Sequence, residues 1–108
     1  MKEPNLIVII ANAHHGMKPD PVNGIFLIDR RTPVGNPFVL YDEAQRDEVC
    51  KKYDVWFYEV GLRDPKVLDY LKQIKSHLDR YDKVTLLCWC IPKRCHGFTI
   101  KKWLEKPI

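Results

Sequence analysis

The sequence lacks any long hydrophobic run. Apolar segments such as residues 6–11 are far shorter than the roughly 20 residues that a transmembrane helix requires. They are also too short for the apolar core of a signal peptide. We therefore expect no membrane partner, and a cytosolic, intracellular protein is the default expectation.

The sequence also lacks internal repeats, low-complexity stretches and any change of composition that would mark a linker. Its 108 residues fit one domain and leave too little length for two hydrophobic cores. A hydrophobic fraction of 45% is enough to build a core and argues against disorder, although 30% of the residues are charged. Residues 1–108 are therefore expected to form a single domain.

Neither sign of charge dominates. Eighteen Lys and Arg against 14 Asp and Glu give a formal net charge of +4. Part of this excess lies near the end of the chain, at Lys93, Arg94, Lys101, Lys102 and Lys106. Such a patch could attract phosphate or nucleic acid, although a solvated surface without a partner is the simpler interpretation.

The signals that accompany disulfide-rich proteins are missing as well. Four cysteines in a short chain would suggest disulfide bonds in a secreted protein. Without a recognisable signal peptide, we expect the thiols to stay reduced. Cys88 and Cys90, on one predicted strand, are also poorly placed to bridge each other.

Three short segments have the pattern of buried strands. Apolar runs between polar and turn residues predict strands over residues 6–11, 25–28 and 84–90. The third is apolar on both faces, as expected for a central strand covered by helices. Segments 12–23 and 32–38 contain the prolines and glycines of irregular loops.

Capping residues predict three helices. The first begins near Asp42 and ends at Gly61, the second begins at Asp64-Pro65, and the third covers about residues 98–105. The faces expected to be buried are Val49, Tyr53, Trp56, Phe57 and Val60 in the first helix, and Val67, Leu68, Leu71, Ile74 and Leu78 in the second.

The order β-β-α-α-β-α predicts an α/β fold with a small three-stranded, partly parallel sheet and helices packed on it. A strand, a helical crossover and a further parallel strand should connect with a right-handed turn. Ligands in such sheets usually bind at the carboxyl ends of the strands. Residues 88–97, with the sequence CWCIPKRCHG, leave the third strand at that end, and this is where we expect a site.

The cysteines of this segment admit two chemical uses. Three cysteines and a histidine are a full set of zinc ligands, but residues i and i+2 of a strand lie about 6.6 Å apart, and we expect no stoichiometric zinc. Alternatively, Lys93, Arg94 and His96 near a helix N-terminus would activate a thiol, with His96 as acid or base. Cys90, Cys95 and His96 are then the catalytic candidates.

Two further interpretations need no chemistry. Gly97 permits close approach to the first amides of the last helix, which with Lys93 and Arg94 would bind an anion. Otherwise the cysteines simply fill the core.

Cys95, on a turn, is expected to have few packing neighbours, so Cys95→Ser should cost little stability, whereas Cys88→Ser should cost about 1–3 kcal/mol.

Residues elsewhere are expected to have structural roles. The histidine pair 14–15 lies in a predicted loop, and His77 is expected at the surface. Cys50 is expected to pack beside the buried face of the first helix. Trp56 and Trp103 are more readily explained as core residues than as stacking surfaces for nucleobases.

Two motifs occur in a distinctive order: TPVGNPF at residues 32–38 and the Cys-Trp-Cys…Cys-His-Gly pattern at residues 88–97. Together they resemble the domain of unknown function 4326 family, which is common in bacteriophage and bacterial genomes. The resemblance covers about residues 25–105. The family often has an acidic residue after Cys-His-Gly, where this chain has Phe98. No established substrate comes with the family.

The resemblance implies one pocket where the two motifs meet. Arg30 would hold an anionic group and Asn36 would orient a nucleotide-like or other phosphorylated ligand. The ligand-binding candidates are Arg30, Gly35, Asn36, Phe38, Arg94 and Gly97. Asn36 and Pro37 would otherwise only set the path of their loop. The alternative function is a non-catalytic module, with or without a stabilising zinc, that binds nucleic acid or a host protein. Neither interpretation names a cofactor.

Overall fold

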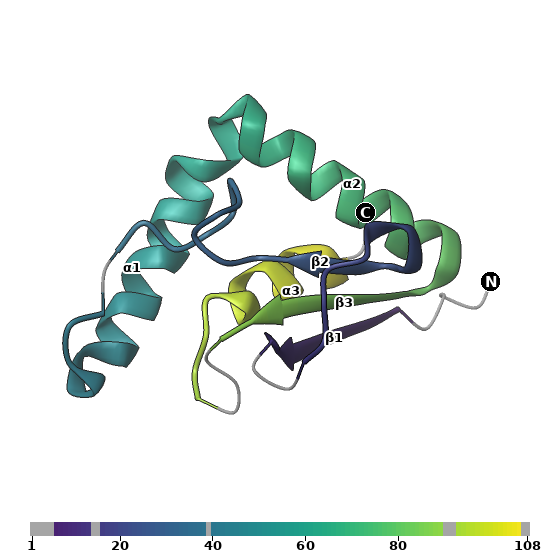
Figure 1. Ribbon diagram of the computed structural model, residues 1–108. Coiled ribbons are helices and arrows are strands. Elements are labelled where there is room, and N and C mark those ends of the chain that lie inside the picture. The colour runs from purple at the N-terminus through teal and green to yellow at the C-terminus, as the bar shows by residue number, and fades with distance from the viewer. Residues whose placement is uncertain (1–5, 14–15, 39, 90–92, 107–108) are drawn as a thin grey trace.

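A single parallel sheet organises the computed structural model, which describes residues 6–13, 16–38, 40–89 and 93–106 (Figure 1). Its strands are β1 (Ile7–Asn12), β2 (Ile25–Leu27) and β3 (Lys83–Cys88), in the order β1-β3-β2. Both pairs are parallel. The predicted α/β fold is confirmed, although β3 ends at Cys88 and Trp89 lies in the bend that follows.

The helices are α1 (Arg46–Glu59), α2 (Pro65–Tyr81) and α3 (Gly97–Glu105). Short 3-10 turns cover Pro21–Asn23, Glu43–Gln45 and Gly61–Arg63. The side chain of Asp64 caps α2 by accepting the backbone N–H of Lys66 at 2.9 Å, as predicted. Across the described residues, none of the helices combines the length and the apolarity that a membrane span requires.

The prediction for the buried face of α1 is wrong at its last residue, Val60. The helix stops at Glu59, and Val60, at φ −120° and ψ −52°, leaves the helical path with a 53% exposed side chain. Gly61 follows this stop, but it starts a 3-10 turn and lies against Trp56, where a Cβ atom would meet the indole at 3.2 Å. Close packing therefore accounts for this glycine.

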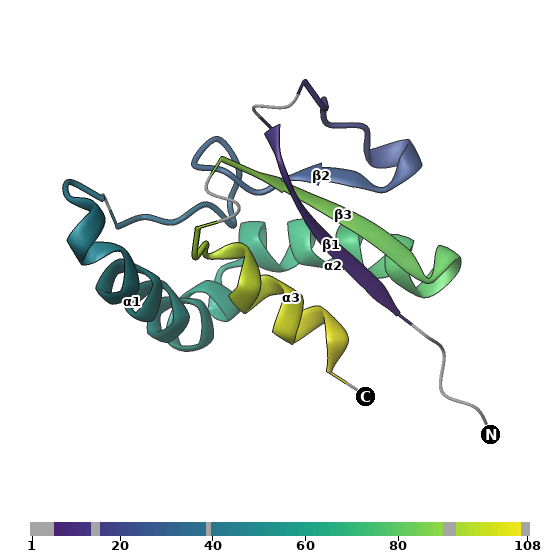
Figure 2. The same cartoon turned by 90° about the horizontal axis from the view of Figure 1, so that it is seen from below.

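The two crossover connections run in opposite directions across the sheet. The chain passes from β1 over β3 to β2, and then returns from β2 to β3 through α1 and α2. Right-handed connections in opposite directions must lie on opposite faces. Accordingly, α2 and α3 cover one face, on which Val8, Phe26 and Leu86 are buried, whereas segment 16–23 passes on the other face (Figure 2).

The expectation that helices cover both sides of the third strand is therefore wrong. Leu87, on the side opposite α2, is fully buried. Ile7 and Ile9, on the same face of edge strand β1, are 50% and 39% exposed. The reason is that the first crossover is a loop, which covers less of the sheet than a helix would.

The burial of individual side chains tests several of the packing predictions. Cys50 is buried, and Trp56 and Trp103 are partly buried against the core, as expected. His77, expected at the surface, is half-buried, and its ring stands 4.6 Å from that of Tyr81 and 6.1 Å from that of Phe26. Among the five α2 residues expected to be buried, only Leu68 is partly exposed.

Candidate functional site

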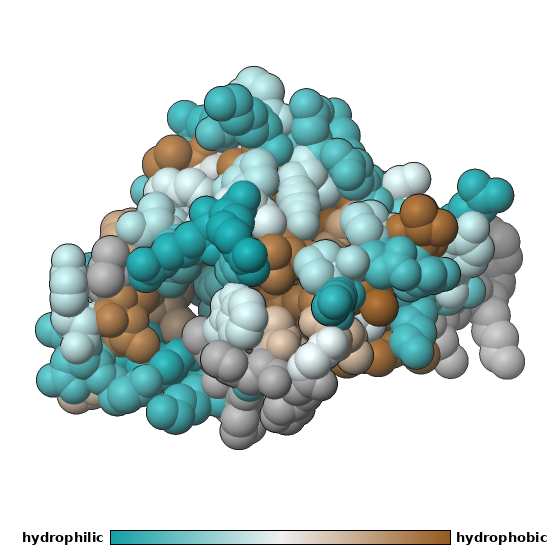
Figure 3. Space-filling view, viewed as in Figure 1, coloured by the Kyte–Doolittle hydropathy of each residue, from teal (hydrophilic) through white to brown (hydrophobic). Residues whose placement is uncertain are grey.

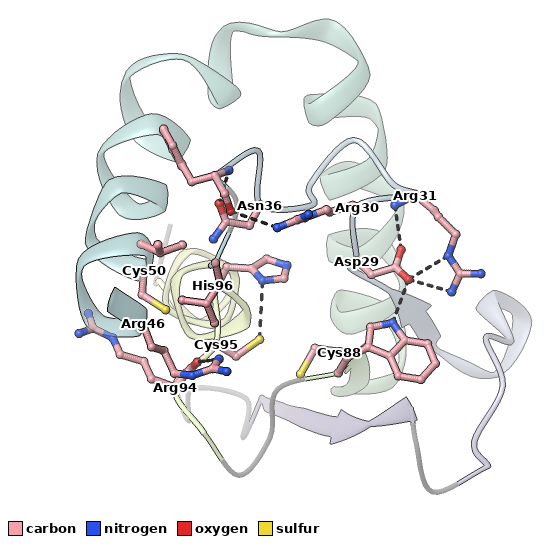
Figure 4. A pocket seen from close by; sticks show the side chains of 14 residues that line it. Asp29, Arg30, Arg31, Asn36, Arg46, Cys50, Cys88, Arg94, Cys95 and His96 are labelled. Atoms are coloured by element: carbon pink, nitrogen blue, oxygen red, sulfur yellow. Dashed lines mark hydrogen bonds and ion pairs between the residues drawn. The ribbon is translucent and has the colours of Figure 1, made fainter. Parts of the chain in front are cut away.

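Two chain segments that follow neighbouring parallel strands meet at one edge of the sheet. We call residues 29–38, after β2, the Asn-Pro loop, and residues 88–97, after β3, the Cys-His segment. Together with α1, the described residues of both segments line an open cavity of about 310 Å³, seen as a hollow left of centre in Figure 3. Its lining includes Asp29, Arg30, Arg31, Asn36, Phe38, Leu40, Arg46, Val49, Cys50, Cys88, Trp89, Arg94, Cys95 and His96 (Figure 4). The expected proximity of the two motifs is confirmed.

The Asn-Pro loop folds back on its own start. A Cβ atom at Gly35 would lie 2.5 Å from the Cα atom of Arg30 and closer still to the carbonyl oxygen of Asp29, so only glycine fits there. Asn36 Oδ1 accepts the backbone N–H of Phe38 at 2.9 Å, and Arg30 donates to the carbonyl oxygen of Phe38 at 3.3 Å. Asn36 therefore sets the loop path while it also lines the cavity, whereas Gly35 does not line it.

Helix α1 holds this loop through Tyr53. The Tyr53 hydroxyl donates to the carbonyl oxygen of Val34 at 2.6 Å, and both residues are fully buried. Burial raises the pKa of Tyr53 far above its usual value, so the phenol remains a neutral donor. The sequence placed Tyr53 on a buried face but did not reveal its partner, because the contact joins segments 19 residues apart.

His96, in the Cys-His segment, contacts the residue that precedes the Asn-Pro loop. Its Nε2 atom is in hydrogen-bond contact with the carbonyl oxygen of Ile28, and a carbonyl can only accept, so Nε2 carries the proton. The Nδ1 atom then presents a lone pair toward Cys95 Sγ, 3.7 Å away. Burial lowers the pKa of His96, which favours the neutral ring at neutral pH.

Cys95 is a buried residue, contrary to the expectation of few neighbours on a turn. It is 2% exposed and belongs to the hydrophobic core, because α3 packs against the sheet directly after it. Its Sγ atom accepts the backbone N–H of Gly97 at 3.3 Å while the side chain lines the cavity. Cys95 and His96 therefore form a paired thiol and imidazole at the cavity wall.

The start of α3 is not built as an anion site. The N–H groups of Phe98 and Thr99 donate to the carbonyl oxygens of Cys95 and His96, at 3.1 and 3.0 Å, and that of Gly97 donates to sulfur. Gly97 itself is buried, and a Cβ there would lie 2.9 Å from Ile28 Cδ1. The prediction that Gly97 opens these amides to a ligand is wrong, because the glycine serves the close packing of α3 on the sheet.

Positive charge at the cavity comes from side chains instead. Four arginines and one aspartate line it, and three of the arginines pair with carboxylates. Arg46, which the sequence analysis missed, donates to the carbonyl oxygen of Arg94 at 3.0 Å, and it also binds Glu43 at 2.7 Å. Arg94 contacts Asp47 at 3.2 Å. Figure 4 shows Arg46 and Arg94 together on one side of the cavity and Arg30 reaching toward Asn36.

The basic patch near the end of the chain is partly neutralised. Lys93 lies 3.5 Å from Glu43, and Arg94 pairs with Asp47. Glu43 lies in the 3-10 turn before α1, and Asp47 lies in the first turn of α1. These pairs reduce the local charge that a nucleic acid would meet outside the cavity.

The zinc hypothesis concerns three cysteines and one histidine of the Cys-His segment. Cys88 and Cys95 line the cavity, but Cys90 lies outside the described residues, as do His14 and His15. Within the described ranges, no three His, Cys, Asp or Glu side chains form a group that could hold a metal ion. The expected absence of zinc stays a prediction.

Comparison with known proteins gives one result. The family model described as "Domain of unknown function (DUF4326)" matches residues 11–106, and the chain therefore belongs to that family. No curated protein and no solved structure matches the chain.

Proposed function

We propose that this member of the family binds a small nucleotide-like, phosphorylated molecule in the cavity between the Asn-Pro loop and the Cys-His segment. The observation that carries the proposal is the set of four arginines around one cavity. Guanidinium groups match the geometry and the charge of phosphate.

The shape of the cavity supports a ligand of limited size. Its volume of about 310 Å³ lies at the lower end of the range for small-molecule pockets, which starts near 300 Å³. Phe38, Leu40 and Val49 contribute apolar surface beside the arginines. A mononucleotide combines these two requirements, because the flat faces of its base can contact apolar side chains and its phosphate is a single anionic end.

Binding is better supported than a reaction. A reaction of the Cys95 thiol would begin with transfer of its proton to Nδ1 of His96, leaving a thiolate and an imidazolium. Burial lowers the pKa of His96 and so disfavours the imidazolium. The environment of His96 therefore opposes this proton transfer, even though the N–H of Gly97 would favour a thiolate.

Thermal unfolding with and without nucleoside monophosphates tests the proposal. A ligand at about 100 times its Kd adds roughly 2.7 kcal/mol of stability. We expect this stabilisation in the parent and a strong reduction in Arg30→Gln and Arg94→Gln. Arg63→Gln is the matched control, because Arg63 follows α1 in a 3-10 turn and does not line the cavity.

Two results would contradict the proposal. The first is the absence of a shift with every mononucleotide. The second is an equal shift in the parent and in the Arg30→Gln, Arg94→Gln double variant. Salt-sensitive binding of DNA or RNA without any mononucleotide effect would favour the nucleic-acid-binding alternative.

A further inference from the structure

Trp89 has features that the strand pattern did not reveal. Trp89 is the first residue after β3, it is among the residues that line the cavity, and it is 43% exposed. Trp56 and Trp103, in contrast, are partly buried against the core. Of these three tryptophans, only Trp89 contributes to the cavity lining.

The indole is held at one edge. Its Nε1–H donates to Asp29 Oδ2 at 3.0 Å, and the Asp29 side chain is only 12% exposed. Burial alone would raise the pKa of Asp29, but hydrogen bonds from Arg31 and Trp89 outweigh it and leave the pKa lowered. Asp29 therefore stays ionised at neutral pH and fixes the indole. A ring that is already oriented loses little freedom when a ligand stacks on it.

The same carboxylate also orients a cation. Arg31 donates its backbone N–H to Asp29 Oδ1 at 2.9 Å and its Nε–H to Oδ2 at 2.9 Å. The side chain of Arg31 remains 69% exposed, so part of its guanidinium faces solvent. Asp29 thus binds the indole of Trp89 and the guanidinium of Arg31 at once, and all three residues line the cavity. Figure 4 shows the pairing of Asp29 with Arg31.

From this arrangement, which rests on the proposed function, we infer that Trp89 is a stacking surface for an aromatic ring of the ligand and that the arginines hold its phosphate. The substrate class is then a nucleobase-bearing phosphate, and a sugar phosphate lacks the part that Trp89 recognises. Stacking of a base on an aromatic side chain is worth roughly 1–3 kcal/mol, enough to discriminate between these classes.

Calorimetric titration with AMP, CMP, ribose 5-phosphate and inorganic phosphate tests the inference. In the parent, AMP binds more tightly than ribose 5-phosphate. Trp89→Leu weakens AMP binding roughly tenfold and leaves ribose 5-phosphate unchanged, while Trp89→Phe keeps most of the AMP affinity. Tyr58→Leu, at a residue of similar exposure, 40%, which does not line the cavity, behaves as the parent does.

The outcomes separate the two proposals. If AMP and ribose 5-phosphate bind equally well and Trp89→Leu changes neither, the stacking role is wrong while phosphate binding stands. If Trp89→Leu weakens both by the same factor, Trp89 acts only through Asp29 and Arg31, and the inference is overturned. If none of the four compounds binds to the parent, the proposed function fails together with the inference. Thermal melting of each variant confirms that it is folded.

Discussion

Replacing Tyr53 by Phe isolates a hydrogen bond that ties α1 to the Asn-Pro loop. The change removes one oxygen and leaves the ring in place, so the ring contacts with Trp56, Phe57 and His96 persist. The carbonyl oxygen of Val34 loses its donor, and the full burial of both residues keeps water from replacing it.

The expected cost is that of an unsatisfied buried acceptor, about 2 kcal/mol within a range of roughly 1–3 kcal/mol. For a domain of 108 residues, with an unfolding entropy of about 2.1 cal/mol/K per residue, this lowers Tm by about 9 °C. Urea denaturation should give a lower midpoint at an unchanged slope. The phenol is neutral in both states at neutral pH, so the difference should not vary between about pH 6 and pH 8.

Tyr58→Phe is the matched control. Tyr58 is 40% exposed, and its contacts with Phe57 and Lys106 use the ring face and edges. Tyr58→Phe should lower the free energy of unfolding by no more than about 0.5 kcal/mol, as most surface substitutions do. Equal costs for the two substitutions would refute the reasoning, because they would show that the bond to Val34 contributes no more than a solvated hydroxyl.

Three further predictions concern the Cys-His segment. Cys95→Ser should lower the free energy of unfolding by about 1–3 kcal/mol in urea, because a buried side chain and a partner of Gly97 are altered; a loss below about 0.5 kcal/mol would restore the sequence-based expectation. The folded state lowers the pKa of His96, so the unfolded chain binds more protons and stability is lost as the pH falls below about 6.5. His96→Gln should remove that part of the slope between about pH 7 and pH 5, and an unchanged slope would count against it. Elemental analysis of the reduced protein should find no stoichiometric zinc, whereas about one zinc per chain, lost on Cys90→Ser, would contradict the spacing argument.

Local signals were sufficient for most of the fold. The cap at Asp64 and the apolar runs of the three strands depend on neighbours a few residues away, and the sequence shows them directly. Local signals did not predict which elements pack on each face of the sheet. Whether Leu87 meets a helix or a loop depends on the strand order β1-β3-β2 and on the handedness of two crossovers.

The candidate site was predictable in its location but not in its chemistry. Because the Asn-Pro loop and the Cys-His segment each follow a parallel strand, the sequence was enough to predict that they lie close together. The burial of Cys95 and Gly97 follows from the close approach of α3 to Ile28 and Ile10, which no local pattern encodes. Arg46 was not predicted as a site residue because it lies on α1, far from both motifs in the sequence. Trp89 was not predicted because it continues the apolar pattern of the third strand.

The central place of β3 has a consequence for the order of folding. β1 and β2 make their sheet hydrogen bonds to β3 and not to each other, and β3 begins only at Lys83. Until that strand is synthesised, both earlier strands lack their partner in the sheet, and contacts so distant in sequence form slowly. During translation, α1 and α2 therefore emerge before any sheet exists, and the apolar edges of β1 and β2 stay exposed to chaperones and to aggregation until the last quarter of the chain closes the fold between them.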